Sequence, residues 1–386
     1  MSTADGVLHS QAISGFFRLP NPLQSSGEFW NALSAKINAT GADMLIPATD
    51  AALEAVSRHC DQLKPLLHVA CPAPAIVERV LNKEATLSVA ASLGVRVPRE
   101  YAVAHLDSSE LIRQISFPVI AKPRQKSATE AFKIRYFRTE DELLRALGNG
   151  ILGDTIVQEY CSGVGVGIEV LIHNGNCIAA FQHRRLSEFP RSGGVAVTAV
   201  AESLDSQLLD TSLKLLRGLQ WEGVAMVEFR HDRNTGVSAL MEVNGRYWGT
   251  LSLPIQAGID FPAYQWQLAH GMMPSVPSSY AVGMTWRWSA GQLKRWHAAL
   301  ITRSRAPYAP NSEPKTASTS AGTRDALWEA NDPYPAILEV FHTGADLLRS
   351  DVRTVTKRVF GRLRPRPVQQ PAPAQARLKT GKGTKD

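Results

Sequence analysis

Two carboxylates and a carboxamide interrupt apolar sequence near the middle of this chain, within residues 224–249. Glu228 lies in the run VAMVEFR, and Glu242 and Asn244 lie in the run VSALMEVNGRYWG. Oxygen ligands of this kind suit Mg²⁺, which usually takes one or two carboxylates and completes its shell with phosphates and water. Arg246 follows two residues after Asn244, in a position to meet a phosphate that the metal holds. These residue types therefore indicate a site for a metal-bound phosphate.

The same stretch predicts the β-hairpin that would position these groups. Its two apolar runs flank a polar segment, HDRNTG, which is a hairpin signal. Residues two apart on a strand share a face, so Glu242 and Asn244 point the same way. Folding about the centre of the loop puts Glu228 nearly opposite Glu242, and like charges across a strand pair destabilise it unless a cation lies between them. An amphipathic hairpin with one hydrated face and a turn at Asn244-Gly245 stays open as the alternative.

Length and composition are those of a soluble protein with two or three domains. The chain has 386 residues, of which 44% are hydrophobic and 20% charged. No apolar run approaches the roughly 20 residues of a membrane helix, and the N-terminal residues lack the pattern of a secretory signal. The four cysteines form no CxxC pair and no zinc-binding spacing, which favours free thiols in a reducing compartment. We therefore expect a cytoplasmic protein without a transmembrane segment.

The net charge of +7 comes from the C-terminal end of the chain. Residues 353–386 hold ten Lys and Arg and one acid, so the remainder of the chain is slightly acidic. A nucleic-acid-binding domain more often carries its basic residues on a folded face, so no specific nucleic-acid partner is expected. The Pro, Gln, Ala and Lys content of the tail indicates disorder.

Residues 1–82 resemble a shortened α/β domain. GADMLIPATD at 41–50 predicts a short strand followed by a helix, and LLHVACPAP at 66–74 predicts a second strand that prolines end. A strand and a helix would be expected before Phe16, but the sequence has only a short, irregular leader there. The first strand–helix unit of such a domain is therefore expected to be missing or shortened.

Strand and helix patterns then continue to about residue 271. Residues 83–98 predict a helix that ends at Gly94, and residues 117–123 predict a strand that carries Lys122. GVGVG at 163–167 opens no helix, so it is interpreted as a turn between strands and not as a dinucleotide fingerprint. The other predicted elements are a strand at 132–137, a capped helix at 139–148, a strand that ends in VQEYCSG, a hairpin through Asn174-Gly175, and helices at 208–221 and 261–271.

The C-terminal third is expected to be helical. Residues 286–300 place tryptophans and leucines at helical spacing, and we interpret Trp286, Trp288 and Trp296 as core residues and not as a base-stacking platform. Residues 303–324 are rich in Ser, Thr, Ala and Pro and predict a linker. A last helical segment follows at 325–348.

The order of these pieces resembles the ATP-grasp superfamily, in particular its carbamoyl-phosphate-synthetase-like, carboxylate–amine ligase branch. A lysine-bearing helix, a small unit with Lys122, the hinge VQEYCSG and a two-acid hairpin ending in MEVNGR follow one another between Lys83 and Gly271. The resemblance implies an α+β (α/β) ATP-grasp fold with a short N-terminal α/β pre-grasp domain and a helical C-terminal extension. The implied boundaries are 1–82 for the pre-grasp domain, 83–273 for the ATP-grasp domain with a lid at about 99–157, 274–350 for the extension and 351–386 for the tail.

Matched position by position, the resemblance implies roles for the candidate residues. Lys83 and Lys122 would contact ATP phosphates. Glu228 would hold one Mg²⁺ and share a second with Glu242 and Asn244, with Mn²⁺ as an alternative ion. Arg246 would face the transferred phosphate, and Arg185 is grouped with it as catalytic. The remaining assignments are the adenine hinge (Gln158, Glu159, Tyr160 and Cys161), Glu169 and Lys126 near the nucleotide, and the region that binds the acid substrate (His183, Arg184, Arg185, Gly193 and Gly194).

Several positions depart from the family pattern or have a simpler interpretation. The loop after the second lysine, RQKSATE at 124–130, has no glycine, so Arg124 or Lys126 would replace backbone amides at the phosphates. Glycines 165 and 167 stand where many relatives have an acid for the ribose, and Gly245 stands where proline is common. As structural alternatives, Lys122 is a solvated strand end, His183 is a packing residue, and Arg184-Arg185 is a solvated pair.

The resemblance implies an ATP-dependent ligase that joins a small-molecule carboxylate to an amine through an acyl phosphate. Phosphoryl transfer needs positioning and neutralisation of charge, which lysines, an arginine and metals supply. Three other functions stay open. The first is an ATP-binding module with reduced turnover, which the glycine-free loop and short leader favour. The second is a small-molecule kinase of the same fold, and the third is a nucleic-acid or membrane-surface protein that acts through its basic tail. The sequence does not name the acid or the amine.

Overall fold

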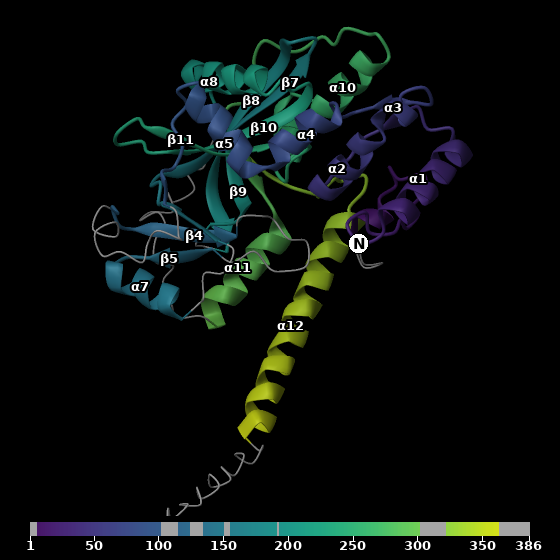
Figure 1. The fold of residues 1–386 in the computed structure, drawn as a ribbon. Coiled ribbons are helices and arrows are strands. Elements are labelled where there is room, and N and C mark those ends of the chain that lie inside the picture. The colour runs from purple at the N-terminus through teal and green to yellow at the C-terminus, as the bar shows by residue number, and fades with distance from the viewer. Residues whose placement is uncertain are drawn as a thin grey trace, which may run out of the picture. The chain divides into compact units, whose positions relative to one another are not determined.

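A seven-stranded sheet carries the two-acid hairpin at one edge. Its strand order is β11-β10-β7-β8-β9-β12-β13 (Figure 1). All neighbouring strands are antiparallel except β12 and β13, which are parallel. The strands are β7 (Val164–His173), β8 (Asn176–Phe189), β9 (Val195–Glu202), β10 (Gly223–His231), β11 (Ser238–Asn244), β12 (Thr285–Arg287) and β13 (Thr323–Asp325).

The computed structural model describes residues 6–101, 115–123, 134–149, 155–190, 193–301 and 322–362. Residues 1–343 form one compact unit, and residues 344–386 form a second one. The predicted lid loop with Arg124 and Lys126, most of the predicted linker and the chain beyond Arg362 lie outside the described residues.

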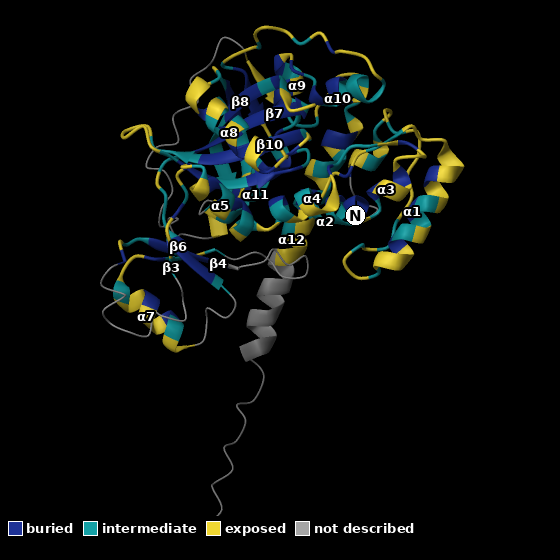
Figure 2. Cartoon of the chain, turned by 45° about the horizontal axis from the view of Figure 1, so that its top comes forward, coloured by how far each residue is buried: buried dark blue, intermediate teal, exposed yellow. Residues whose placement is uncertain are grey.

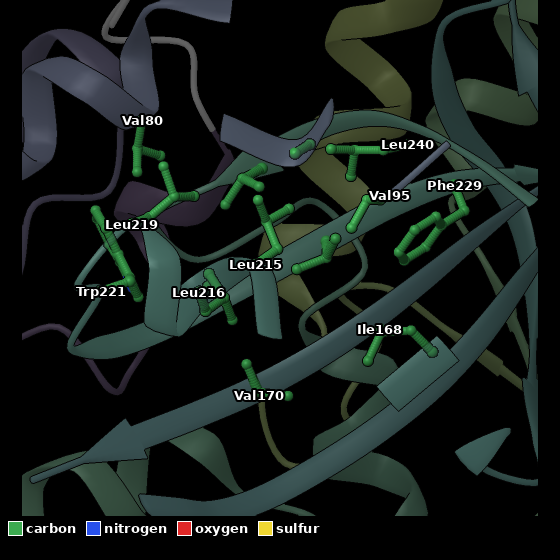
Figure 3. Packing of buried hydrophobic residues seen from close by; sticks show 14 of the residues in the cluster. Val80, Val95, Ile168, Val170, Leu215, Leu216, Leu219, Trp221, Phe229 and Leu240 are labelled. Atoms are coloured by element: carbon green, nitrogen blue, oxygen red, sulfur yellow. The ribbon is translucent and has the colours of Figure 1, made fainter. Parts of the chain in front are cut away.

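Apolar side chains alternate between the two faces of the main sheet because successive strand residues point to opposite sides. One face packs against α5 (Lys83–Ser92) and α8 (Ser206–Gly218) through Ile168, Val170 and Phe229 of the sheet, as Figure 3 shows for Leu215 and Leu216 of α8. The other face packs Phe181 and Trp286 against Trp248 and against α9 (Ser252–Ala257) and α10 (Phe261–Ala269). The central strands are therefore buried on both sides (Figure 2).

A second, four-stranded sheet has the order β3-β6-β4-β5. Its strands are β3 (Glu100–Tyr101), β4 (Val119–Pro123), β5 (Arg135–Phe137) and β6 (Thr155–Glu159). Val119, Ala121 and Val157 pack in one cluster with Leu143 of α7 (Glu140–Gly148). The alternate residues, among them Lys122 and Gln158, consequently face away from α7.

The two strands that the sequence predicts in the N-terminal segment are present and form a small parallel sheet. Strands β1 (Met44–Leu45) and β2 (His68–Val69) pair in parallel. Before Phe16 the described residues form only the short 3-10 helix η1 (Gly6–His9), and the 15-residue helix α1 (Ser26–Thr40), which sequence analysis did not predict, buries Phe29, Leu33 and Ile37. The other helices here are α2 (Asp50–Arg58), α3 (Cys60–Leu63) and α4 (Pro74–Leu81).

Two predicted elements are wrong in type. Most of the GVGVG segment lies in β7 and not in a turn, because its valines point into the core while its glycines face the other side of the sheet. Residues 285–287 form β12, and the helix α11 (Ser289–Ile301) begins after it, so the C-terminal part is not purely helical. Trp286 is 2% exposed, but Trp296 is 61% exposed and is not a core residue.

The last helix, α12 (Tyr334–Arg362), spans the boundary between the two units. In the described part of the chain, no helix combines the length and apolarity that crossing a membrane requires.

Candidate active site

The register of the β10–β11 hairpin places its acids face to face. Glu228 pairs directly with Glu242, and Met226 pairs with Asn244, so the predicted juxtaposition is confirmed. The side-chain amide of Asn244 donates a 3.2 Å hydrogen bond to Glu242 Oε1. Glu228 and Asn244 are buried, whereas the Glu242 side chain remains 23% exposed. Three oxygen-bearing groups thus share one face at the edge of the main sheet.

One lysine from a helix and one from the four-stranded sheet lie near these oxygens. Lys83 is the first residue of α5, and its Nζ lies 3.1 Å from Glu242 Oε2. Lys122 lies on β4 and is buried. Burial and, to a smaller extent, the positive charge of Lys83 lower the pKa of Lys122 to about 8, although Glu242 acts in the opposite direction. The two lysines and Glu242 therefore form one electrostatic group.

The pKa of Lys122 predicts that nucleotide affinity depends on pH. Burial disfavours the charged ammonium, so the folded protein loses this proton as the pH rises through about 8. If Lys122 binds a phosphate as the ammonium, ADP affinity should fall above pH 8, by up to about tenfold per pH unit. Titrations of ADP at several pH values check this, and Lys122→Arg, which stays charged, should flatten the profile. An unchanged profile in that variant would mean that Lys122 does not bind the phosphates.

Arg246 is held by a residue from the N-terminal segment. Its Nε donates to Asp50 Oδ1 at 2.7 Å, and its Nη2 lies 3.4 Å from Asn244 Oδ1. Asp50 begins α2 and also lines a cavity of about 640 Å³. That cavity extends between α2, α4, α5 and the edge strand β11, and Lys83, Glu242 and Asn244 line its wall. The cavity therefore opens onto the group of acids and lysines.

Glu228 also belongs to a network of four charged side chains, whose other members are Arg185, Glu188 and Arg230. Arg185 of β8 forms a salt bridge with Glu228 and lies 3.6 Å from Glu188. Arg230 pairs with both carboxylate oxygens of Glu188, at 3.1 and 3.0 Å. Burial raises the pKa of Glu228 and Arg185 opposes this increase, while the neighbouring Glu242 adds to it. The buried Glu228 is thus paired with a cation and faces a like charge.

The predicted hinge places its side chains in different environments. Gln158 is fully buried, and neither atom of its amide has a partner among the residues that the structure describes. Glu159 turns instead toward Arg96 Nη2, at 2.6 Å, and toward the backbone amide of Arg99. The Tyr160 ring meets Tyr136 edge-on. Burial raises the pKa of the Cys161 thiol to about 11, so it stays protonated near neutral pH.

Three residues that were predicted to bind substrate or nucleotide, Arg184, His183 and Glu169, contact other side chains of the protein instead. Arg184 points to the opposite face of the sheet from Arg185 and lies 2.5 Å from Glu202. His183 Nδ1 lies 2.7 Å from Glu169 Oε1, and both side chains are buried. Burial raises the pKa of Glu169, although His183 opposes it. Of the glycines, Gly194 accepts a hydrogen bond from Arg185 through its carbonyl, and Gly193 lies near the Tyr136 hydroxyl.

Sequence analysis missed Asp50, Glu188 and Arg230 as parts of this region. Asp50 is 196 residues from Arg246, so no local pattern links them. Arg230 had a signal, because it stands two residues after Glu228 on the same strand and therefore shares its face. Gly245 also has a definite reason: a Cβ there would collide with the buried Trp221 ring.

The oxygen groups of Glu228, Glu242 and Asn244 are of the types that bind a magnesium ion. No group of three or more His, Cys, Asp or Glu gathers at a metal-binding distance within the described ranges. Two facing carboxylates and one carboxamide are what Mg²⁺ takes when phosphates and water complete its shell. The donor set is therefore suited to a metal–phosphate complex and not to a metal held by protein alone.

Comparison with known proteins identifies the fold. Residues 152–291 match the family described as ATP-grasp in the biosynthetic pathway with Ter operon. Biotin carboxylase from Campylobacter jejuni, in complex with β,γ-ATP, superposes with a TM-score of 0.53 at 19% identity over 68% of this chain and 62% of that one. L-amino acid ligase from Bacillus licheniformis gives 0.50 at 18% identity over 65% and 61%. No curated protein matches in sequence.

A third structure shows the same fold with a nucleotide bound. The biotin carboxylase domain of 2-oxoglutarate carboxylase from Hydrogenobacter thermophilus, solved with MgADP and bicarbonate, gives a TM-score of 0.51 at 19% identity over 67% of this chain and 61% of that one. The chain thus spans somewhat over 60% of the length of the structures it resembles. The family match and the shared architecture agree with the order of motifs in the sequence. The chain therefore has the ATP-grasp fold, and its residues 152–291 match an ATP-grasp family.

Proposed function

We propose that this protein is an ATP-dependent ligase that joins a small-molecule carboxylate to an amine through an acyl phosphate. The observation that carries the proposal is the meeting of Glu228, Glu242 and Asn244 with Lys83 of helix α5 and Lys122 of the four-stranded sheet. Oxygen ligands for a metal and cations for phosphates lie together between the two sheets. This is the charge arrangement that phosphoryl transfer requires.

In this proposal, ATP binds with its base at the hinge and its phosphates at the lysines. The buried amide of Gln158, which has no partner among the described residues, has a donor and an acceptor for the edge of adenine. Lys83, from helix α5, and Lys122, from the four-stranded sheet, neutralise the phosphates. Glu228, Glu242 and Asn244 would hold two Mg²⁺ ions, which would supply positive charge to the phosphates during transfer.

The carboxylate substrate then attacks the γ-phosphorus, the acyl phosphate forms and ADP leaves. Arg246, held by Asp50, is oriented toward the same oxygens and stabilises the transferred phosphoryl group. The amine attacks the acyl carbon, phosphate leaves, and a C–N bond forms. The 640 Å³ cavity beside Glu242 and Asn244 is large enough for a small acceptor molecule. Exclusion of water would protect the acyl phosphate until the amine arrives.

The names of similar structures support this reaction class. One is an L-amino acid ligase, and two are biotin carboxylases described with β,γ-ATP or with MgADP and bicarbonate. At 18–19% identity, the similarity to these structures shows the fold alone. The reaction is inferred from the residues of the site in this chain. We also propose a cytoplasmic location, where ATP is supplied and the four cysteines stay reduced.

The test is ADP release, measured with a panel of carboxylic acids in the presence and absence of amines. Release that requires both an acid and an amine, with an amide as the product, is the expected result. Release with an acid alone and a stable phosphorylated product would identify a kinase. Nucleotide binding without any release across the panel would favour a binding module over a ligase.

A further inference from the structure

Two glycines leave the site-facing side of the central strand β7 without side chains. Gly165 and Gly167 alternate along β7 with Val166 and Ile168, which point into the hydrophobic core. A Cβ at Gly165 would lie 2.9 Å from Arg185 Cδ, and a Cβ at Gly167 would lie 2.5 Å from His183 Cε1. Side chains of the neighbouring strand β8 therefore occupy the space above both glycines.

This space lets β8 reach across β7 to β10. Strand β7 lies between them, with Gly167 paired to Glu228 on one side and to His183 on the other. Arg185 crosses above Gly165 and forms its salt bridge with Glu228. A strand of ordinary residues would separate these two charges, because their side chains would meet the one between them.

The crossing brings a cation to a carboxylate that needs one. Glu228 is only 7% exposed and faces Glu242 directly across the hairpin. A buried carboxylate beside a like charge is costly unless a cation neutralises it. Arg185 supplies that charge in the protein without metal, and a divalent cation would supply the same charge when bound. The two cations therefore compete for one carboxylate.

Arg185 has a second set of partners when it leaves Glu228. Its Nη1 already donates to the Gly194 carbonyl at 3.2 Å, and Glu188 lies 3.6 Å away. Its side chain is 12% exposed, so it is close to the site surface and not enclosed in the core. A shift of the guanidinium toward these groups would free both oxygens of Glu228.

We propose that Gly165 is a positioning residue that brings Arg185 to Glu228, and that Arg185 holds the place of the divalent cation there until the cation binds. The proposal rests on the metal site of the proposed function, and not on the identity of the acid or the amine. It assigns Arg185 a role before catalysis begins. Metal binding would then also release a guanidinium beside Gly194, where it can meet an anionic substrate.

The test measures Mn²⁺ binding by electron paramagnetic resonance at saturating ADP, in the full-length protein. Arg185→Met removes the competing cation, so Mn²⁺ should bind about tenfold more tightly. The melting temperature without metal should fall, because Glu228 loses its partner. Gly165→Ala should push Arg185 away from Glu228 and change both quantities in the same directions by a smaller amount, which keeps the test valid if Arg185→Met does not fold.

Two matched glycine variants separate this role from simple crowding. Gly167→Ala crowds His183 on the same strand and face, so it should lower the melting temperature without tightening Mn²⁺ binding. Gly148→Ala, whose Cβ would meet nothing within 4 Å, should change neither quantity. Equal or weaker Mn²⁺ binding in Arg185→Met and Gly165→Ala would overturn the inference. Absence of Mn²⁺ binding in the parent protein would overturn the proposed metal site as well.

Discussion

Glu242→Gln is expected to lower Mg²⁺-dependent ATP turnover by about 10³-fold or more while the protein remains folded. Glu242 is paired directly with Glu228 across the hairpin, and its Oε1 accepts a hydrogen bond from the side-chain amide of Asn244. The neutral amide would remove one of the two carboxylates available to the metal, and metal-ion stabilisation of transferred phosphate is worth several kcal/mol. At about 1.4 kcal/mol per factor of ten, a loss of roughly 4 kcal/mol gives this change.

Stability should change little, because two effects oppose each other. The substitution removes the repulsion between Glu242 and Glu228, but it also removes the ion pair with Lys83. ADP release and thermal unfolding measure the two quantities. Glu202→Gln is the matched control, since Glu202 lies on the same sheet but pairs with Arg184 and Arg233, away from the acid group. Turnover equal to that of the parent in Glu242→Gln would show that the metal assignment is wrong.

Arg246→Ala is expected to lower the turnover rate by about 10²- to 10³-fold, which is the usual loss when one charge-stabilising donor is removed from an active site. Arg246 is fixed by Asp50 and by Asn244, and it stands next to the edge of the site and not at the hinge. Its charge should matter most when the phosphoryl group is transferred. The kcat value should therefore fall much more than the affinity for ADP.

The anchor of Arg246 makes this prediction specific. Asp50→Asn keeps the shape of the anchor and weakens the ion pair, so it should reproduce part of the loss in kcat. Because both changes act through the same guanidinium, the double variant should lose little more than Arg246→Ala alone. Arg233→Ala is the control, because Arg233 is exposed and forms a salt bridge with Glu202. An equal loss of ADP affinity and kcat in Arg246→Ala would assign the residue to nucleotide binding.

The hairpin and its acids could be predicted because they depend on local patterning. The period-two alternation along a strand sets which residues share a face, and a short polar loop sets the register, so Glu228 could be placed opposite Glu242. The order of the elements could likewise be read from apolar runs and their breaks. The same logic was misapplied at residues 163–167, where glycines spaced by valines are a strand pattern and not a turn.

The adjacent residues Arg184 and Arg185 show what local sequence patterns cannot predict. Adjacent residues of a strand face opposite sides, so at most one of Arg184 and Arg185 could reach the site. Which one does so depends on the register of β8, which shifts twice between Arg185 and Glu188. Glu169 and His183 likewise meet each other only because their two strands pair in this register.

By itself, the sequence determined the ATP-grasp order of motifs, the two-acid hairpin and the types of residue available for phosphoryl transfer. Only the tertiary structure decided which charges meet. Lys122 reaches the acids from a second sheet, Asp50 reaches Arg246 across 196 residues, and Arg185 reaches Glu228 over Gly165. The physical reason is that propensity and periodicity act over a few residues, whereas a buried charge is neutralised by whatever partner the packing of distant elements brings within a few ångströms.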